Sequence, residues 1–198
     1  MVRSPQIASS VPSTVIVPSN TYVATWLAVS RTGAQVVPAE PDPCTSNLDP
    51  ARIGKVVTSR TRAVLPVHMF GQACDMDSLS NVAAERGIPV IEDAAQALNA
   101  FYSGRPLGSI GPLGIYSFHE TKNYICGEGG ALCVNRPDLI DRACVIRDKG
   151  TNRQKFMAGE VDKYSWVAVG GSYVPSEIVC AFLLSQLQAM SSITRRRC

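Results

Sequence analysis

The sequence predicts an α/β fold in which helices cover both faces of a mainly parallel sheet. Short apolar runs, typical of buried strands, alternate with helical stretches, and Gly, Pro and Asp mark where these elements begin and end. Strands that alternate with helices are joined by right-handed crossovers, which make the strands parallel. With 198 residues, 45% of them hydrophobic, the chain can bury one sizeable core and is expected to form one domain.

Six segments are predicted to be strands, namely 14–17, 35–37, 63–67, 89–92, 114–118 and 131–134. Helices are predicted at 22–31, from Asp49-Pro50 onward, and at 75–86, 137–147 and 176–190. Asp49 offers an N-cap before a proline at the first helical position. The helix at 75–86 is expected to end at Gly87. Ser176 is expected to cap the last helix, and residues 149–171 to form a long polar loop.

An amine and a carboxylate follow two of the predicted strands. Asp93 closes the apolar run 87–92, and Lys122 lies in the polar turn after strand 114–118. Open α/β sheets bind ligands at the carboxyl ends of their strands. A lysine that holds an aldehyde as a Schiff base and an acid that keeps a ring nitrogen protonated are what pyridoxal phosphate requires. Lys122 and Asp93 are therefore candidates for a pyridoxal phosphate site.

Each of these two residues also has a plainer interpretation. Asp93 could cap a following helix through backbone N–H groups, which is a common role for Asp after a strand. A lone lysine in a turn is usually solvated. Their occurrence together with Gln96, Ser117 and the glycine-rich segment 127–130 favours the cofactor site.

Composition and charge exclude several other classes of protein. The net charge of +3 is small and the basic residues are scattered apart from Arg195-Arg196-Arg197, so no nucleic-acid partner is expected. Seven cysteines without a C-x-x-C pair indicate neither a disulfide framework nor a metal site, and favour reduced thiols. No apolar run approaches the roughly 18–20 residues of a membrane span, and no signal peptide is evident. We therefore expect a cytoplasmic protein without a membrane partner.

Several motifs, in order, resemble one family closely. From about Val15 to Leu187 the chain is similar to the large domain of the DegT/DnrJ/EryC1/StrS sugar-nucleotide aminotransferases, nearest to those that act on dTDP-4-oxo-6-deoxy-glucose. The motifs are 17–22, Pro66-Val67-His68 with Gly71, 92–96, 117–123, 127–131, 149–153 and 161–164. The resemblance implies the three-layer large domain of the aspartate aminotransferase-like, type I fold.

The resemblance also implies a role for each matching residue. Lys122 would form the Schiff base with pyridoxal phosphate, Asp93 would pair with the pyridinium nitrogen, and Gln96 would contact the phenolic oxygen. Ser117 would donate to the phosphate. Tyr22 would stack on the cofactor ring, or it could instead be a core aromatic on an amphipathic helix.

The implied reaction is transamination of a nucleotide-linked 4-keto-6-deoxy sugar, with glutamate as amino donor, for cell-surface polysaccharide or deoxysugar biosynthesis. Lys122 would move the protons. His119 could be catalytic, or a packed or solvent-facing ring. The basic residues of the polar loop, Lys149, Arg153, Lys155 and Lys163, could hold a diphosphate or be solvated. The family further implies a homodimer with shared active sites.

The chain departs from the family pattern at both ends. Family members normally carry an N-terminal segment that cradles the cofactor phosphate, and a smaller C-terminal domain. We therefore expect 1–13 to be an unmatched segment, 14–190 a partial cofactor-binding large domain, and 191–198 a basic tail, with the small domain missing. Two alternatives follow: a working aminotransferase, or a truncated, catalytically silent relative that acts as a binding protein or is a gene remnant.

Overall fold

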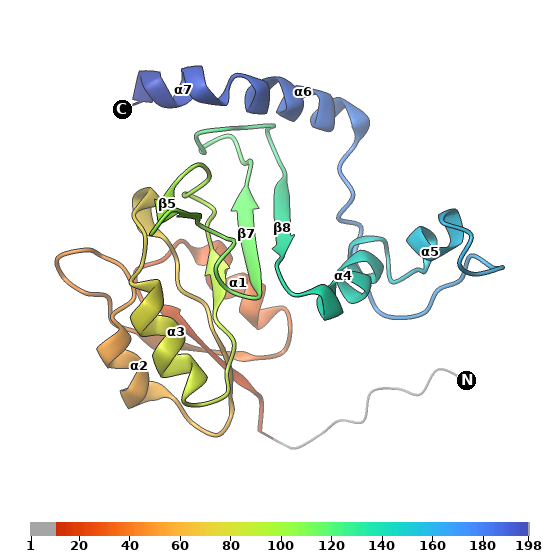
Figure 1. The fold of residues 1–198 in the computed structure, drawn as a ribbon. Coiled ribbons are helices and arrows are strands. Elements are labelled where there is room, and N and C mark those ends of the chain that lie inside the picture. The colour runs from red at the N-terminus through yellow and green to blue at the C-terminus, as the bar shows by residue number, and fades with distance from the viewer. Residues whose placement is uncertain (1–10, 198) are drawn as a thin grey trace. The chain divides into compact units, whose positions relative to one another are not determined.

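The computed structural model describes residues 11–197 in two compact units, the first ending at Tyr116 and the second beginning at Ser117 (Figure 1). Residues 1–10 of the predicted N-terminal segment 1–13, and Cys198 of the predicted basic tail, lie outside the described residues.

A parallel sheet organises the first unit. Strand β1 (Thr14–Pro18) lies between β2 (Gln35–Ala39) and β3 (Thr61–Val64), and both pairings are parallel. Two parallel bridges link β3 and the residues after it to the segment of β4 (Ile91–Asp93), which pairs in parallel with β7 (Leu113–Ser117). The predicted mainly parallel sheet is confirmed.

Helices cover both faces of this sheet. Successive side chains of a strand point to opposite faces, so neighbouring residues of β1 pack against different helices. Ile16 of β1 packs in one apolar cluster with residues of α2 (Pro50–Val56) and α3 (Met76–Ala84), which lie side by side in Figure 1. The next residue, Val17, packs in a second cluster with residues of α1 (Val23–Ser30). Both side chains are fully buried, and each burial contributes about 1.5–3 kcal/mol.

The predicted cap at Asp49 is confirmed, and Asp75, which was predicted only as the start of a helix, is also a cap. The Asp49 carboxylate accepts from the Ala51 N–H at 2.9 Å, and α2 begins directly after it. Asp75 caps α3 in the same way, accepting from the Ser78 N–H at 3.1 Å. Such caps stabilise a helix by about 1 kcal/mol each, which explains why the Asp49-Pro50 signal located the start of α2 correctly.

A short hairpin in the first unit was not predicted. Strands β5 (Phe101–Tyr102) and β6 (Arg105–Pro106) pair in antiparallel fashion around Ser103 and Gly104, whose φ values are 49° and 77°. Positive φ at both central residues is what a two-residue hairpin turn of type I′ requires. Strands of two residues are too short to show alternation, which is why the pattern missed them. A single 3₁₀ turn, η1 (Met69–Gly71), follows β3.

The second unit contains one further strand, β8 (Gly130–Val134), and several short helical elements joined by turns and loops. Its helical elements are η2 (Pro137–Leu139), α4 (Ile140–Arg147), α5 (Arg153–Met157), α6 (Glu177–Gln188) and α7 (Met190–Arg197). The expectation of an unbroken loop at 149–171 is wrong, because α5 lies inside it. The basic tail is also helical, and its three arginines occupy the last turn of α7, where cations interact favourably with the helix dipole.

Helix α6 begins as predicted after Ser176, whose hydroxyl accepts from the Val179 N–H at 3.4 Å. Its apolar residues are largely exposed, Ile178 at 82% and Phe182 at 51%. Within residues 11–197, no single helix has the length and apolar character to cross a membrane. The pair α6 and α7, bent by 62°, meets those two criteria only when both helices are taken together.

Candidate functional site

Asp93 is the last residue of β4 and lies at the carboxyl edge of the sheet, where its residue is only 4% exposed. One carboxylate oxygen, Oδ2, accepts from the Thr25 hydroxyl at 2.9 Å, and the other, Oδ1, accepts from the Ala95 N–H at 3.1 Å. Both donors are neutral, and no ion pair with Asp93 occurs in the described part of the chain. A buried carboxylate with only two donors keeps acceptor capacity on both oxygens, and a cationic donor would stabilise its charge.

The helix-cap alternative for Asp93 is wrong in this structure. Turns, not a helix, follow β4, and the chain then continues into β5. The hydrogen bond from the Ala95 N–H therefore closes a local turn, and it leaves lone pairs on both carboxylate oxygens for a further donor.

Thr25, which the sequence did not single out, completes the surroundings of Asp93. It lies on α1, is 6% exposed, and its hydroxyl also lies 2.9 Å from that of Thr21, four residues earlier. Thr21 lies just before α1, so this contact joins the segment that leads into the helix to the helix's first turn. The residues around Thr25 in the sequence could not reveal its hydrogen bond to Asp93, which lies 68 positions away.

Gln96 has one fixed side-chain contact. Its Oε1 accepts from the Phe70 N–H at 2.8 Å, in a segment where Phe70 adopts a positive φ of 57°. Because the oxygen is committed to this donor, the amide nitrogen is left with two N–H groups to offer to an anionic oxygen.

Tyr22 immediately precedes α1 at its N-cap position and is 69% exposed. The alternative that it is a core aromatic of an amphipathic helix is therefore wrong. Its exposed ring lies one turn before Thr25, whose N–H donates to the Tyr22 carbonyl at 3.1 Å. The ring is thus free to stack on a ligand.

Ser117 and Lys122 belong to the second unit. Ser117 is the last residue of β7, and its hydroxyl accepts from the His119 N–H at 3.3 Å. Lys122 is half-buried, and its backbone N–H donates to the His119 carbonyl at 2.9 Å. The turn is closed by the Cys126 N–H, which donates to the carbonyl of Phe118 at 2.8 Å.

The side chain of His119 makes contacts within this turn and with Glu128. Its Nδ1 accepts from the Thr121 N–H at 3.2 Å and lies 2.9 Å from the Thr121 hydroxyl. Its Nε2 lies 3.6 Å from Glu128 Oε1, an ion pair when the ring is protonated. The ring is 38% exposed, and these contacts favour a structural role in the turn over a catalytic one.

The acid before Asp93 has a separate environment. Glu92 is fully buried, and its carboxylate accepts from the N–H groups of Gly108, Ile110 and Gly111 at 2.8, 2.6 and 2.7 Å. His68 Nε2 lies 3.2 Å from it. Burial raises the pKa of Glu92, but the hydrogen bonds from His68 and the three amides outweigh burial and hold this pKa below its ordinary value.

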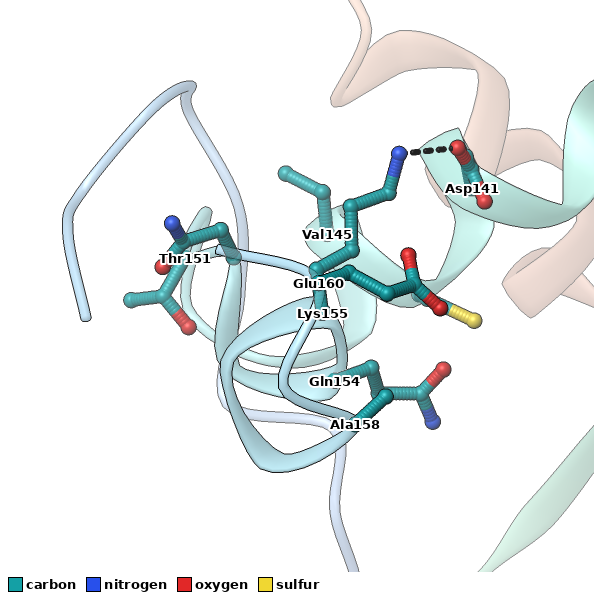
Figure 2. Close-up of a pocket in the computed structure, with 9 residues that line it drawn as sticks. Asp141, Val145, Thr151, Gln154, Lys155, Ala158 and Glu160 are labelled. Atoms are coloured by element: carbon teal, nitrogen blue, oxygen red, sulfur yellow. Dashed lines mark ion pairs between the residues drawn. The ribbon is translucent and has the colours of Figure 1, made fainter. Parts of the chain in front are cut away.

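The basic residues of segment 149–171 mostly face acids. Figure 2 shows Lys155 Nζ paired with Asp141 at 2.5 Å, beside a pocket of about 160 Å³ to which Glu160 also contributes. Lys149 and Arg153 approach the Asp148 carboxylate at 3.8 and 4.0 Å. The pocket is smaller than the roughly 300–1,000 Å³ typical of ligand sites. Its mixed charge does not favour a diphosphate site at Lys155.

The fold places the site where α/β enzymes bind ligands. The chain passes from β1 to β2 on one side and to β3 on the other, so the strand order reverses beside β1. Ligands bind outside the carboxyl ends of strands at such switch points. Asp93 lies at the same edge, at the end of β4, which makes this edge of an α/β domain the candidate ligand site.

The chain belongs to the DegT/DnrJ/EryC1/StrS aminotransferase family, whose sequence model matches residues 7–198. Aminotransferases of this family depend on pyridoxal phosphate. The predicted family and fold class are thereby confirmed.

Two curated relatives illustrate the match. The chain is 41% identical over 184 residues to the dTDP-3-amino-3,4,6-trideoxy-alpha-D-glucose transaminase of Streptomyces venezuelae, covering 92% of this chain and 46% of the relative. It is 39% identical over 174 residues to the GDP-perosamine synthase of Caulobacter vibrioides, covering 88% and 45%. The chain thus spans about half the length of the curated relatives it matches.

Solved structures of similar sequence have the same fold over most of this chain. S. venezuelae DesV in complex with a ketimine intermediate superposes with a TM-score of 0.82 at 41% identity, covering 91% of this chain and 47% of that one. The 3-amino-5-hydroxybenzoic acid synthase superposes with a TM-score of 0.84 at 32% identity, covering 91% and 46%.

Proposed function

We propose that this chain binds pyridoxal phosphate and acts in transamination of a nucleotide-linked 4-keto-6-deoxy sugar, with glutamate as amino donor, in polysaccharide or deoxysugar biosynthesis. The observation that carries the proposal is Asp93, a buried carboxylate whose two donors are neutral, at the carboxyl edge of the sheet in a domain of this family. A protonated ring nitrogen would donate to the remaining lone pairs of this carboxylate and stabilise its charge.

The residues of the first unit suit the cofactor's ring. Asp93 would accept from the ring nitrogen, and the free N–H groups of Gln96 would donate to the phenolic oxygen. The exposed ring of Tyr22 would stack on the cofactor, a contact worth about 1 kcal/mol beyond its buried area. In the second unit, the Ser117 hydroxyl would donate to the phosphate.

When bound, the cofactor supplies an electron sink for the pair of electrons released from a C–H bond. The chain's own contribution would be proton transfer and anchoring. Lys122 would hold the cofactor aldehyde as a Schiff base through Nζ, and its freed amine would take the donor's Cα proton and deliver protons in the second half-reaction. Asp93 would keep the ring nitrogen protonated throughout.

Sugar nucleotides with the keto group at C3 and at C4 should both be tested as substrates. The S. venezuelae relative is named for a 3-amino sugar, whereas the motif resemblance points to a 4-keto substrate. Both substrate types, linked to dTDP and to GDP, belong in the screen.

We further propose a cytoplasmic homodimer. Support comes from the family and from apolar side chains left exposed in the second unit, such as Val169 at 84% and Ile178 at 82%. Sedimentation of the purified chain at several concentrations tests the assembly state.

The experiment that tests the function is covalent trapping. The purified chain is mixed with pyridoxal phosphate, its absorbance is recorded, borohydride is added, and the labelled peptide is mapped. We expect a stable label on Lys122, retained in the control Lys163→Ala, whose lysine is exposed, and lost in Lys122→Ala. Asp93→Asn should keep the label but lose most amino transfer, because a neutral partner weakens the sink.

The opposite outcomes are equally informative. Transamination that survives in Lys122→Ala would refute the assignment. A folded chain that takes no label would support the catalytically silent alternative.

A further inference from the structure

The last helix of the chain contacts the turn that carries Lys122. Arg197 Nη1 donates to Asn123 Oδ1 at 2.9 Å, and the hydroxyl of Thr194 lies 2.5 Å from that of Tyr124. Both helix residues belong to α7, and both turn residues directly follow Lys122 in sequence. All of these contacts lie within the second unit.

The direction of the hydroxyl pair follows from the proton count. The Thr194 hydroxyl has one proton, which it donates to the Met190 carbonyl at 3.0 Å. Tyr124 is therefore the donor and Thr194 Oγ1 the acceptor. Tyr124 is only 3% exposed, so its hydroxyl needs this partner.

The two helix residues are three apart, which places them on one face of α7. That face holds two consecutive residues of the turn, one through a charged side chain and one through a buried hydroxyl. The other end of the turn is held by His119 and by the hydrogen bond from the Lys122 N–H. Lys122 therefore lies between two fixed points.

We infer that α7 is a positioning element for Lys122, with Arg197 and Thr194 as its positioning residues. Fixing residues on both sides of Lys122 removes backbone freedom that a turn otherwise keeps, and a reacting amine displaced by about 1 Å reacts on the order of 10²-fold more slowly. This inference rests on the proposed role of Lys122. In this interpretation Arg197, in the last turn of α7, holds the turn at Asn123.

The test uses the full 198-residue chain. The variant Thr194→Val/Arg197→Gln removes both contacts, and Arg196→Gln is the matched control, because its arginine is exposed and makes neither contact. Amide hydrogen exchange over residues 119–126 is measured without cofactor, and pyridoxal phosphate affinity is measured by absorbance. Thermal unfolding verifies that each variant is folded.

We expect exchange over 119–126 to rise by about tenfold in the double variant, and the cofactor dissociation constant to rise by a similar factor, since two hydrogen bonds of this kind are lost. Arg196→Gln should match the parent. Thr194→Ser should also match it, because the hydroxyl is retained. Equal exchange and affinity in the double variant and in Arg196→Gln would overturn the inference.

The two hypotheses fail separately. If the parent chain takes no cofactor, the proposed function fails, and hydrogen exchange still shows whether α7 orders the turn. If the parent is labelled on Lys122 and the double variant behaves identically in both measurements, the function stands and the positioning role is refuted.

Discussion

The imidazole of His68 and the carboxylate of Glu92 lie 3.2 Å apart, and both side chains are fully buried. His68 Nδ1 accepts from the Cys74 N–H at 3.1 Å, so the ring proton is on Nε2 and points to the acid. The imidazole is therefore neutral, and the charge of Glu92 is stabilised by hydrogen bonds rather than by a cation. This arrangement joins β4, the segment that follows β3 and the segment 108–111.

Glu92→Gln should destabilise the chain strongly. An amide nitrogen would replace one carboxylate oxygen and face N–H donors, leaving buried donors without an acceptor, at a cost of about 2–4 kcal/mol. Urea denaturation of the purified chain measures it. The matched control is Glu128→Gln, whose side chain is 87% exposed and whose loss should change the free energy of unfolding little. A stability equal to that of the control would show that the network contributes nothing.

Acid should remove the contribution of Glu92. The folded-state pKa lies below the ordinary value of 4.5, so the ionised carboxylate is stabilised by folding. The contribution is fully present above the unfolded-state pKa and is lost as pH falls through the folded-state pKa. The stability difference between the parent and Glu92→Gln should thus be constant from neutral pH to about 5, and shrink below about 4.5. Denaturation across this pH range measures it, and a difference that grows in acid would contradict the assignment.

The sequence predicted the scaffold better than the site. Strand runs, caps such as Asp49 and the position of Asp93 depend on neighbouring residues, which a local pattern contains. The hydrogen bond from Thr25 to Asp93 and the three amides around Glu92 join segments far apart in the chain, so only the folded backbone brings them together. Helix α5 was missed because five residues are too few to show a helical period.

Cys74 should resist alkylation in the folded chain. Its residue is fully buried, and burial raises the pKa of its thiol to about 12. Compared with an ordinary thiol of pKa 9.0, the reactive thiolate is about a thousandfold scarcer at neutral pH. Iodoacetamide labelling with peptide mapping should modify the exposed Cys44 first and Cys74 only after denaturation. The control Cys44→Ser should lose the label at that position and leave Cys74 protected; rapid native labelling of Cys74 would refute its burial.

Thr25→Val should weaken the site around Asp93 without changing the shape of the side chain. The substitution removes the hydroxyl that donates to Oδ2 at 2.9 Å, and a lost hydrogen bond to a buried carboxylate costs about 1.5–3 kcal/mol. We expect the free energy of unfolding without cofactor to fall by that amount in Thr25→Val. In Thr25→Ser, which keeps the donor, it should fall by about 1 kcal/mol or less for the missing methyl group.

Added pyridoxal phosphate should restore part of the stability lost in the valine variant, because a ring nitrogen that donates to the same carboxylate replaces the missing donor. Urea denaturation with and without the cofactor measures both effects. Equal losses in the valine and serine variants would show that Thr25 acts through packing, and a valine variant that the cofactor does not stabilise would place the ring nitrogen elsewhere than at Asp93.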